Sequence, residues 1–195
     1  MDPERLSGTM AAAVTRGHAI CAEALGKQEC AELAEALGRQ EFIPLPVHPI
    51  PCITQHGEKV ELQRADSNAS LAWNLADQLA EAAAVLPPPH SEFRPNDLVV
   101  QRYQMGSAGV SAHHDSSKFR LLIVILTIKG SAELRLHHER LAAPHLTLAI
   151  GPGDLCVLEA PTTARRQAEL PFHSVSGPTT ASRMSLTFRM AVAGS

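Results

Sequence analysis

The sequence predicts a mainly β protein of the α+β class, in which helices of the N-terminal part pack on one sheet of a β-sandwich or barrel. Two observations lead to this prediction. Helical periodicity is confined to the first half of the chain, whereas the second half consists of short apolar runs separated by Gly and Pro. The change falls near Pro87, the first of three consecutive prolines.

Two segments of the first half have the 3.6-residue repeat of an amphipathic helix. Residues 27–37 carry apolar side chains at i, i+3, i+4 and i+7, and Gly38 follows as a C-terminal stop. Residues 69–86 repeat the pattern after Ser67 and Asn68, which are candidate N-caps. The segment 39–66 between them is rich in Pro and polar residues, so we expect an irregular flap or edge strands there.

The second half contains short apolar runs that are typical of β-strands. We expect strands at residues 98–103, 121–129, 132–136, 146–150, 154–159, 173–175 and 183–190. A chain of 195 residues fits one domain. We therefore expect a single domain over residues 1–195, with a helical and flap region at 1–96 and a β-core at 97–190.

Composition excludes several classes of protein. The apolar fraction of 45% and charged fraction of 19% are ordinary for a soluble globular protein. A net charge of −3 and 4% aromatic residues disfavour a nucleic-acid partner without removing it. The first 20 residues lack a signal-peptide pattern, and no apolar run is long enough to span a membrane, so we expect a cytoplasmic protein with no membrane partner. The four cysteines are scattered and are expected to be buried free thiols.

Two nearby residues have the pattern of metal ligands. His113 and Asp115 are two positions apart, so in an extended segment both point to one side and His114 points away. His173 lies far enough along the chain for several strands to return a third ligand to them. Two imidazoles and one carboxylate leave coordination positions open, which suits Fe(II) oxygen chemistry better than structural zinc. We predict His113, Asp115 and His173 as metal ligands and catalytic residues.

The last expected strand presents a polar row. Arg183, Ser185, Thr187 and Arg189 share one face, and the apolar residues between them share the other. A guanidinium grips a carboxylate with two parallel hydrogen bonds, so this row suits a dicarboxylate co-substrate. The two arginines are roughly 20 Å apart along an ideal strand. If only one arginine binds the small dicarboxylate, Arg183 is therefore the stronger candidate. Arg189 could instead pair with a surface carboxylate.

The order of these motifs resembles the 2-oxoglutarate/Fe(II) oxygenases, and the ending is similar to their AlkB-like branch. The resemblance covers residues 97–190 and rests on the following residues: Tyr103, Gly106, His113-His114-Asp115, Gly153-Asp154, His173 and the strand from Arg183 to Arg189. The chain departs from the AlkB-like pattern in two places. Gln101 stands where that pattern has Asn, and the spacer from Gly106 to His113 is one residue longer.

The resemblance implies a double-stranded β-helix, or jelly roll, with iron at one mouth. It implies Fe(II) and 2-oxoglutarate as cofactor and co-substrate, with O2 and an organic substrate as further partners. Arg183 would bind the distal carboxylate of 2-oxoglutarate with the help of Tyr103, and Arg189 would lie near the keto-acid end. Ser185 and Gln101 are the remaining candidate contacts of the co-substrate.

Three functions fit these residues. The leading hypothesis is a dioxygenase that hydroxylates a small-molecule or amino-acid-type substrate and releases succinate and CO2. The first alternative is an AlkB-like dealkylase or hydroxylase acting on nucleic acid, and the second is a cupin-like metal-binding module without turnover. No motif specifies the organic substrate or the oligomeric state.

Other conspicuous residues have a structural interpretation. We expect His137 and His138 to be solvated at a hairpin end, and Trp73 to belong to the core. Gly153-Asp154 is read as a tight turn that opens a strand. Arg165-Arg166 is read as a solvated loop, with contact to an anionic substrate as the alternative.

Overall fold

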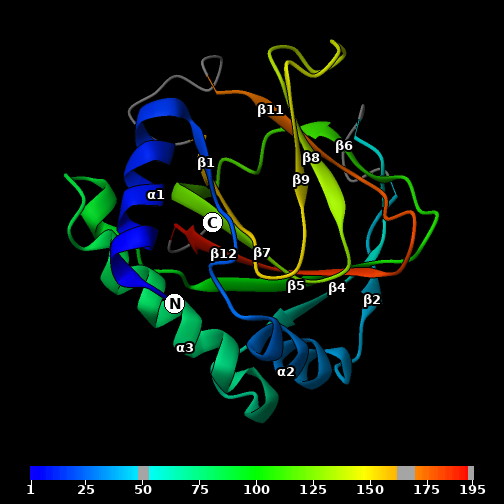
Figure 1. Cartoon of the computed structure of the whole chain (residues 1–195), viewed down its shortest axis with the longest axis horizontal. Helices are drawn as coiled ribbons and strands as arrows, with labels where there is room; N and C mark the ends of the chain where they lie inside the picture. The colour runs from blue at the N-terminus through cyan, green and yellow to red at the C-terminus, as the bar shows by residue number, and fades with distance from the viewer. Residues whose placement is uncertain (48–52, 162–169, 193–195) are drawn as a thin grey trace.

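The computed structural model describes residues 1–47, 53–161 and 170–192, which fold as two antiparallel sheets with helices on one side (Figure 1). Its helices are α1 (Pro3–Arg16), α2 (Lys27–Gly38) and α3 (Ser70–Ala83), with short 3-10 turns η1 (Ser67–Ala69) and η2 (His90–Glu92). The predicted class, a mainly β protein with a jelly-roll core and N-terminal helices, is confirmed.

The larger sheet has seven strands and the smaller sheet has five. The order in the larger sheet is β1 (His18–Cys21), β10 (Leu155–Glu159), β7 (Phe119–Lys129), β12 (Arg183–Ala191), β5 (Asp97–Tyr103), β4 (Glu58–Leu62) and β2 (Ile43–Pro44). The order in the smaller sheet is β3 (Gln55–His56), β6 (Gly109–His113), β11 (Phe172–Ser176), β8 (Ala132–His137) and β9 (Leu146–Ile150). The seven strands expected from the sequence are all present, with bounds that differ by at most two residues.

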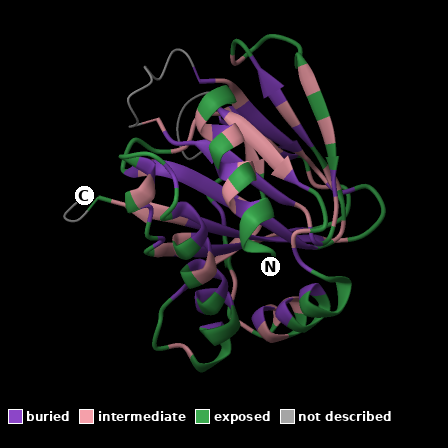
Figure 2. Cartoon of the chain, turned by 60° about the vertical axis from the view of Figure 1, so that its left-hand side comes forward, coloured by how far each residue is buried: buried purple, intermediate pink, exposed green. Residues whose placement is uncertain are grey.

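One apolar core lies between the helices and the larger sheet. Leu79 of α3 is completely buried, as are Leu186 and Phe188 on the helix-facing side of β12. Buried residues concentrate on the strands and on the helix faces turned toward them (Figure 2). The apolar half of the alternating strand 183–190 therefore anchors β12 to the helices, which leaves its polar half for the space between the sheets.

A second, smaller core lies between the two sheets and is built from residues such as Phe119, Ile123 and Leu136. It fills only part of that space. The remainder is lined by polar side chains of β5, β6, β11 and β12, and it forms the candidate site.

Several elements were not expected from the sequence. Helix α1 is capped by Asp2, whose side chain accepts hydrogen bonds from two backbone N–H groups, and it ends at Gly17 with φ of 85°. Asp2, Pro3 and Gly17 are ordinary helix start and stop signals, so α1 could have been predicted. The described part of segment 39–66 forms the edge strands β2 and β3, and the strand β4 between β2 and β5. Edge strands were one of the two expectations for this segment.

Helix α3 ends at Ala83, three residues before the predicted end. Leu86 precedes Pro87, and a residue before proline is disfavoured in the helical region, so the last turn cannot continue.

Among the described residues, no helix combines the length and the apolar character that a transmembrane span requires.

Candidate metal and co-substrate site

The three predicted metal ligands meet at one end of the space between the sheets. His113 ends β6 and is the direct cross-strand partner of His173 in β11, with ring centroids 4.3 Å apart. Asp115 follows two residues after His113, and its Oδ2 lies 3.3 Å from His173 Nε2. The ligand atoms of the three residues all lie within 4.8 Å of one another, so they could hold one ion.

Two features prepare these side chains for a cation. His113 Nδ1 lies 2.8 Å from the Ser111 carbonyl oxygen, so the N–H on Nδ1 donates there and Nε2 keeps a free lone pair. Burial, helped by the neighbouring His173, lowers the pKa of His113 to about 4, so the ring is neutral at pH 7. Burial alone would raise the pKa of Asp115, but the hydrogen bond from His173 and the nearby charges outweigh it and hold this pKa below its ordinary value.

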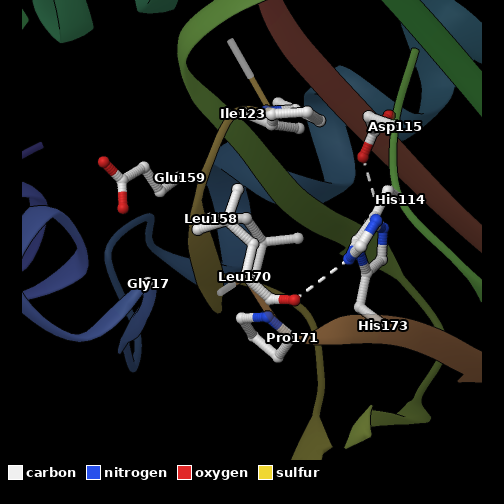
Figure 3. A pocket seen from close by; sticks show the side chains of 10 residues that line it. Gly17, His114, Asp115, Ile123, Leu158, Glu159, Leu170, Pro171 and His173 are labelled. Atoms are coloured by element: carbon white, nitrogen blue, oxygen red, sulfur yellow. Dashed lines mark hydrogen bonds and ion pairs between the residues drawn. The ribbon is translucent and has the colours of Figure 1, made fainter. Parts of the chain in front are cut away.

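His114 is not one of the three clustered ligands and lies just beyond the end of β6. Its Nε2 lies 3.0 Å from the Leu170 carbonyl oxygen (Figure 3). Its ring stacks on the Phe172 ring, with the centroids 3.9 Å apart. Figure 3 also shows a narrow apolar pocket, with Leu158 and Pro171 among its walls, that reaches Asp115 and His173 from the side. His114 therefore lines a small pocket beside the metal cluster.

A cavity of about 70 Å³ extends from the three ligands along the polar face of β12. It is lined by Gln55, Gln101, Tyr103, Val110, His113, Asp115, Ile125, His173, Val175, Arg183, Ser185, Thr187 and Arg189. The structure thus brings every predicted co-substrate residue to the same cavity as the predicted metal ligands. Their individual roles in binding remain predictions.

Arg183 is a buried cation without an anionic partner among the described residues. It is 1% exposed, and it donates only to Ser185 Oγ at 3.3 Å and Thr127 Oγ1 at 3.1 Å. Its Nε is buried and has no hydrogen-bond partner within the described part of the chain. Burial lowers the pKa of Arg183 to about 10, which still leaves it protonated at pH 7. A buried unpaired charge is unfavourable, so this site is complementary to a carboxylate.

The neighbours of Arg183 come from β5. Tyr103 is its direct cross-strand partner and is 3% exposed, and Gln101 faces Ser185 in the same register. Gly57 packs on the Tyr103 ring so closely that a Cβ there would lie 2.9 Å from ring carbons. The absence of a side chain at Gly57 therefore leaves the space that the Tyr103 ring occupies.

Arg189, at the other end of the polar row, is already paired. Its Nε and Nη2 donate to Asp97 Oδ1 at 2.8 Å and 2.5 Å, and its Nη1 lies 4.0 Å from Asp115 Oδ1. The guanidinium also covers the Phe119 ring at 4.1 Å. This is the carboxylate pairing that the sequence left open as an alternative, and it directs Arg189 toward a metal ligand. A contact with the keto-acid end of the co-substrate stays a prediction.

Sequence reasoning missed three residues of this site. Asp97 faces Arg189 across β5 and β12, Thr127 lies on β7 beside Arg183, and Gln55 comes from the edge strand β3. No local motif marks these positions. Asp97 could have been found only from the antiparallel register of β5 and β12, which places it directly opposite Arg189.

Of the structural interpretations that fall on described residues, those for Trp73, His138 and Asp154 are confirmed and the one for His137 is wrong. Trp73 is buried in the core, and Asp154 closes a turn by accepting a hydrogen bond from the Gly151 backbone. His138 is exposed, but His137 is buried and its ring nitrogens contact Ser174 Oγ and the Ala142 carbonyl, so the expectation of a solvated His137 is wrong. Strand β8 extends to residue 137, which packs this ring against β11.

The cysteines agree with the expectation where they are described. Cys21, Cys30 and Cys156 are free and buried. Cys52 and the pair Arg165-Arg166 lie outside the described residues.

Comparison with solved structures shows the fold. A prolyl hydroxylase from Trichoplax adhaerens, in complex with a peptide fragment of the hypoxia inducible factor oxygen degradation domain, matches with a TM-score of 0.73 and 15% identity over 97% of this chain and 90% of that one. A Pseudomonas putida prolyl-4-hydroxylase matches with a TM-score of 0.67 and 17% identity over 96% and 99%. The non-haem alpha ketoglutarate-dependent epimerase SnoN from nogalamycin biosynthesis matches with a TM-score of 0.63 and 18% identity over 96% and 83%. These identities establish shared architecture and not a shared reaction.

Comparison by sequence shows the family. No curated protein sequence matches the chain. The family model described as the 2OG-Fe(II) oxygenase superfamily matches residues 22–189 and so includes all three clustered ligands and the polar strand. This match is to the superfamily as a whole and does not single out its AlkB-like branch. The chain belongs to the 2OG-Fe(II) oxygenase superfamily, and it is an enzyme whose cofactor is Fe(II) and whose co-substrate is 2-oxoglutarate.

Proposed function

We propose that this protein, acting as a single dioxygenase domain, hydroxylates a small-molecule or amino-acid-type substrate and releases succinate and CO2. In this proposal His113, Asp115 and His173 hold Fe(II), and Arg183 binds the distal carboxylate of 2-oxoglutarate. The observation that carries it is the buried Arg183 guanidinium, which has no anionic partner in residues 1–47, 53–161 and 170–192 and shares a cavity with the three-residue metal cluster. A dicarboxylate in that cavity would supply the missing negative charge.

Each part of the cavity has a separate task in this proposal. Iron, when bound, supplies the oxygen chemistry that couples decarboxylation of 2-oxoglutarate to oxidation of a substrate C–H bond. Arg183 donates hydrogen bonds from two of its nitrogens to the Thr127 and Ser185 hydroxyls, and in this position it binds the distal carboxylate of the co-substrate. Tyr103 forms the wall beside it. The two sheets surround the site with protein, which limits access of water to the reacting groups.

The amino-acid-type substrate is supported by composition and by the structural neighbours. The net charge of −3 and the scarcity of aromatic residues do not favour a nucleic-acid substrate. Two of the similar structures are named as prolyl hydroxylases, and one of them was solved with a peptide fragment. The alternating strand from Arg183 to Arg189 is the feature that favours the AlkB-like branch and a nucleic-acid substrate as the second candidate.

The deciding experiment measures succinate formed from 2-oxoglutarate with Fe(II), ascorbate and one added substrate class at a time. We expect stimulation by free amino acids, proline-containing peptides or small metabolites, with a product heavier by one oxygen in mass spectrometry. Stimulation by a methylated oligonucleotide alone would reassign the enzyme to the AlkB-like branch. His173→Ala is the matched control, because it should abolish Mn²⁺ binding and succinate formation together while the protein stays folded.

A further inference from the structure

A basic groove lies outside the site described above, along the open edge of the β-sandwich. Strand β1 ends the larger sheet and strand β9 ends the smaller one, so within the described residues each has a free edge. In Figure 1 α1 runs beside β1, and β9 forms one edge of the smaller sheet. These three elements line a groove of about 540 Å³. An unpaired strand edge is a template for one more strand.

The walls of the groove leave room for an added chain. Helix α1 turns one face toward it, at positions i, i+3, i+4, i+7 and i+11: Arg5, Gly8, Thr9, Ala12 and Arg16. The middle of this face is small, and a Cβ built on Gly8 would have no heavy atom within 4 Å. The opposite wall presents Leu146 and Leu148, which are only partly buried, and Ile20 of β1 lies between the walls.

The charges of the groove are all of one sign. Its lining residues include two arginines and no carboxylate, in a chain whose net charge is −3. Arg5 Nη2 donates to the Ala22 carbonyl at 2.7 Å, at the end of β1, while Arg16 lies two residues before its start. The free edge of β1 is thus bracketed by an arginine at each end.

Helix stability alone does not account for this arrangement. Arg16 is in the last turn of α1, where the helix dipole favours a cation, but Arg5 is in the first turn, where the dipole disfavours one. The hydrogen bond to Ala22 uses one of the five N–H donors of Arg5. Eleven helical residues span about 16 Å, which matches about five residues of an extended strand. Because the Arg5 guanidinium is held at the Ala22 end of β1, an extended chain is better suited than one small anion to contact both arginines.

We propose that this groove binds an extended segment of a partner protein, added as a strand at the edge of β1, with acidic side chains at both ends and apolar side chains between them. The carboxylates meet Arg5 and Arg16, and the apolar residues contact Ile20, Leu146 and Leu148. Backbone hydrogen bonds between the segment and β1 provide affinity, as in other cases of strand addition. The carboxylates at the two ends of the segment fix its register along β1.

The test uses a fluorescein-labelled peptide, Glu-Val-Thr-Val-Glu, whose two carboxylates lie about 13 Å apart on one face, within reach of the long arginine side chains. We expect saturable binding in fluorescence anisotropy that weakens as salt is raised. Arg16→Glu should raise the Kd roughly tenfold or more. Gly8→Trp should abolish binding because the indole fills the groove. The matched charge reversal Arg39→Glu, at the exposed end of α2, should leave the Kd unchanged.

Turnover of 2-oxoglutarate should stay at the wild-type value in all three variants, which separates this surface from the catalytic site. The two charge reversals should lower the melting temperature by only a few degrees, because an exposed charge at a helix end is worth about 1 kcal/mol or less. The proposal is overturned if the peptide shows no saturable binding up to about 1 mM. It is also overturned if a Gln-Val-Thr-Val-Gln peptide binds equally well, or if Arg16→Glu has no effect. Concentration-dependent dimerisation that Gly8→Trp removes would assign the groove to a second copy of this chain instead.

Discussion

Replacing Arg183 with Met should stabilise the ligand-free protein and abolish its response to 2-oxoglutarate. Methionine keeps an unbranched apolar stem and removes the guanidinium, which is 1% exposed and lacks an anionic partner among the described residues. The pKa of Arg183 falls from 12.5 to about 10, chiefly through burial. A fall of this size corresponds to about 3 kcal/mol against the charged form in the folded state.

The gain is partly offset by lost hydrogen bonds. Arg183 donates to Ser185 and Thr127, and such bonds are worth about 1 kcal/mol each. The net expectation is an increase of about 1 kcal/mol in the free energy of unfolding of the ligand-free protein. For a chain of this size, that raises the melting temperature by roughly 2–4 °C.

Co-substrate binding should change in the opposite direction. Hydrogen bonds to a charged group contribute about 1.5–3 kcal/mol each, so loss of a two-bond contact should weaken 2-oxoglutarate binding by roughly 100-fold or more. Thermal unfolding with Mn²⁺ in place of iron measures this without turnover. At 2-oxoglutarate 100-fold above its Kd the wild-type protein gains about 2.7 kcal/mol, and the variant should gain almost nothing at the same concentration.

Two results would refute this reasoning. A variant that keeps the full 2-oxoglutarate-dependent shift would show that Arg183 does not bind the co-substrate. A ligand-free variant destabilised by about 3 kcal/mol or more, the loss expected on breaking a buried ion pair, would show that the guanidinium already has a strong partner. Arg39→Met at the exposed end of α2 is the control, and it should shift stability by less than about 0.5 kcal/mol.

Three further predictions concern the surroundings of the site. Asp97→Asn should weaken Mn²⁺ binding roughly tenfold in a calorimetric titration, because it releases the arginine that faces Asp115; unchanged affinity would leave Asp97 with a structural role only. Gly57→Ala should displace the Tyr103 ring, lower the free energy of unfolding by about 1–3 kcal/mol and raise the KM for 2-oxoglutarate. An unchanged KM would show that Tyr103 does not contribute to co-substrate binding. Burial raises the pKa of Cys156 to about 12, so peptide mapping should find it unmodified by iodoacetamide at pH 8 in the folded protein and modified after unfolding; rapid labelling of the native protein would contradict its burial.

The fold could be predicted from the sequence because its signals are local. Alternation along 183–190 and the 3.6-residue repeats of α2 and α3 depend on neighbouring residues only. The short edge strands β2 and β3 are two residues each and carry no such pattern, so they emerge only from pairing with β4 and β6. Helix α1 is different, since Asp2, Pro3 and Gly17 marked both of its ends and were available in the sequence.

The candidate metal ligands could be predicted for a similar reason. Two of them, His113 and Asp115, lie in one extended segment where spacing fixes the side on which they point. The environment of each residue could not be predicted in the same way. The partners that distinguish one polar residue from another, such as Thr127 for Arg183, come from strands distant in the chain.

The two arginines of β12 show how much this environment decides. Arg183 and Arg189 lie on the same face of one strand and line the same cavity, so the alternation of the sequence treats them alike. Asp97 stands opposite Arg189 and neutralises it, whereas Tyr103 stands opposite Arg183. A phenol is neutral at pH 7, and burial raises the pKa of Tyr103 further, so this residue offers no negative charge. The Arg183 guanidinium therefore keeps its charge for a ligand, and the Arg189 guanidinium near Asp115 is held by the protein itself. It follows that introducing a carboxylate opposite Arg183, as in Tyr103→Asp, should compete with 2-oxoglutarate for the same guanidinium and weaken its binding more than Tyr103→Phe does.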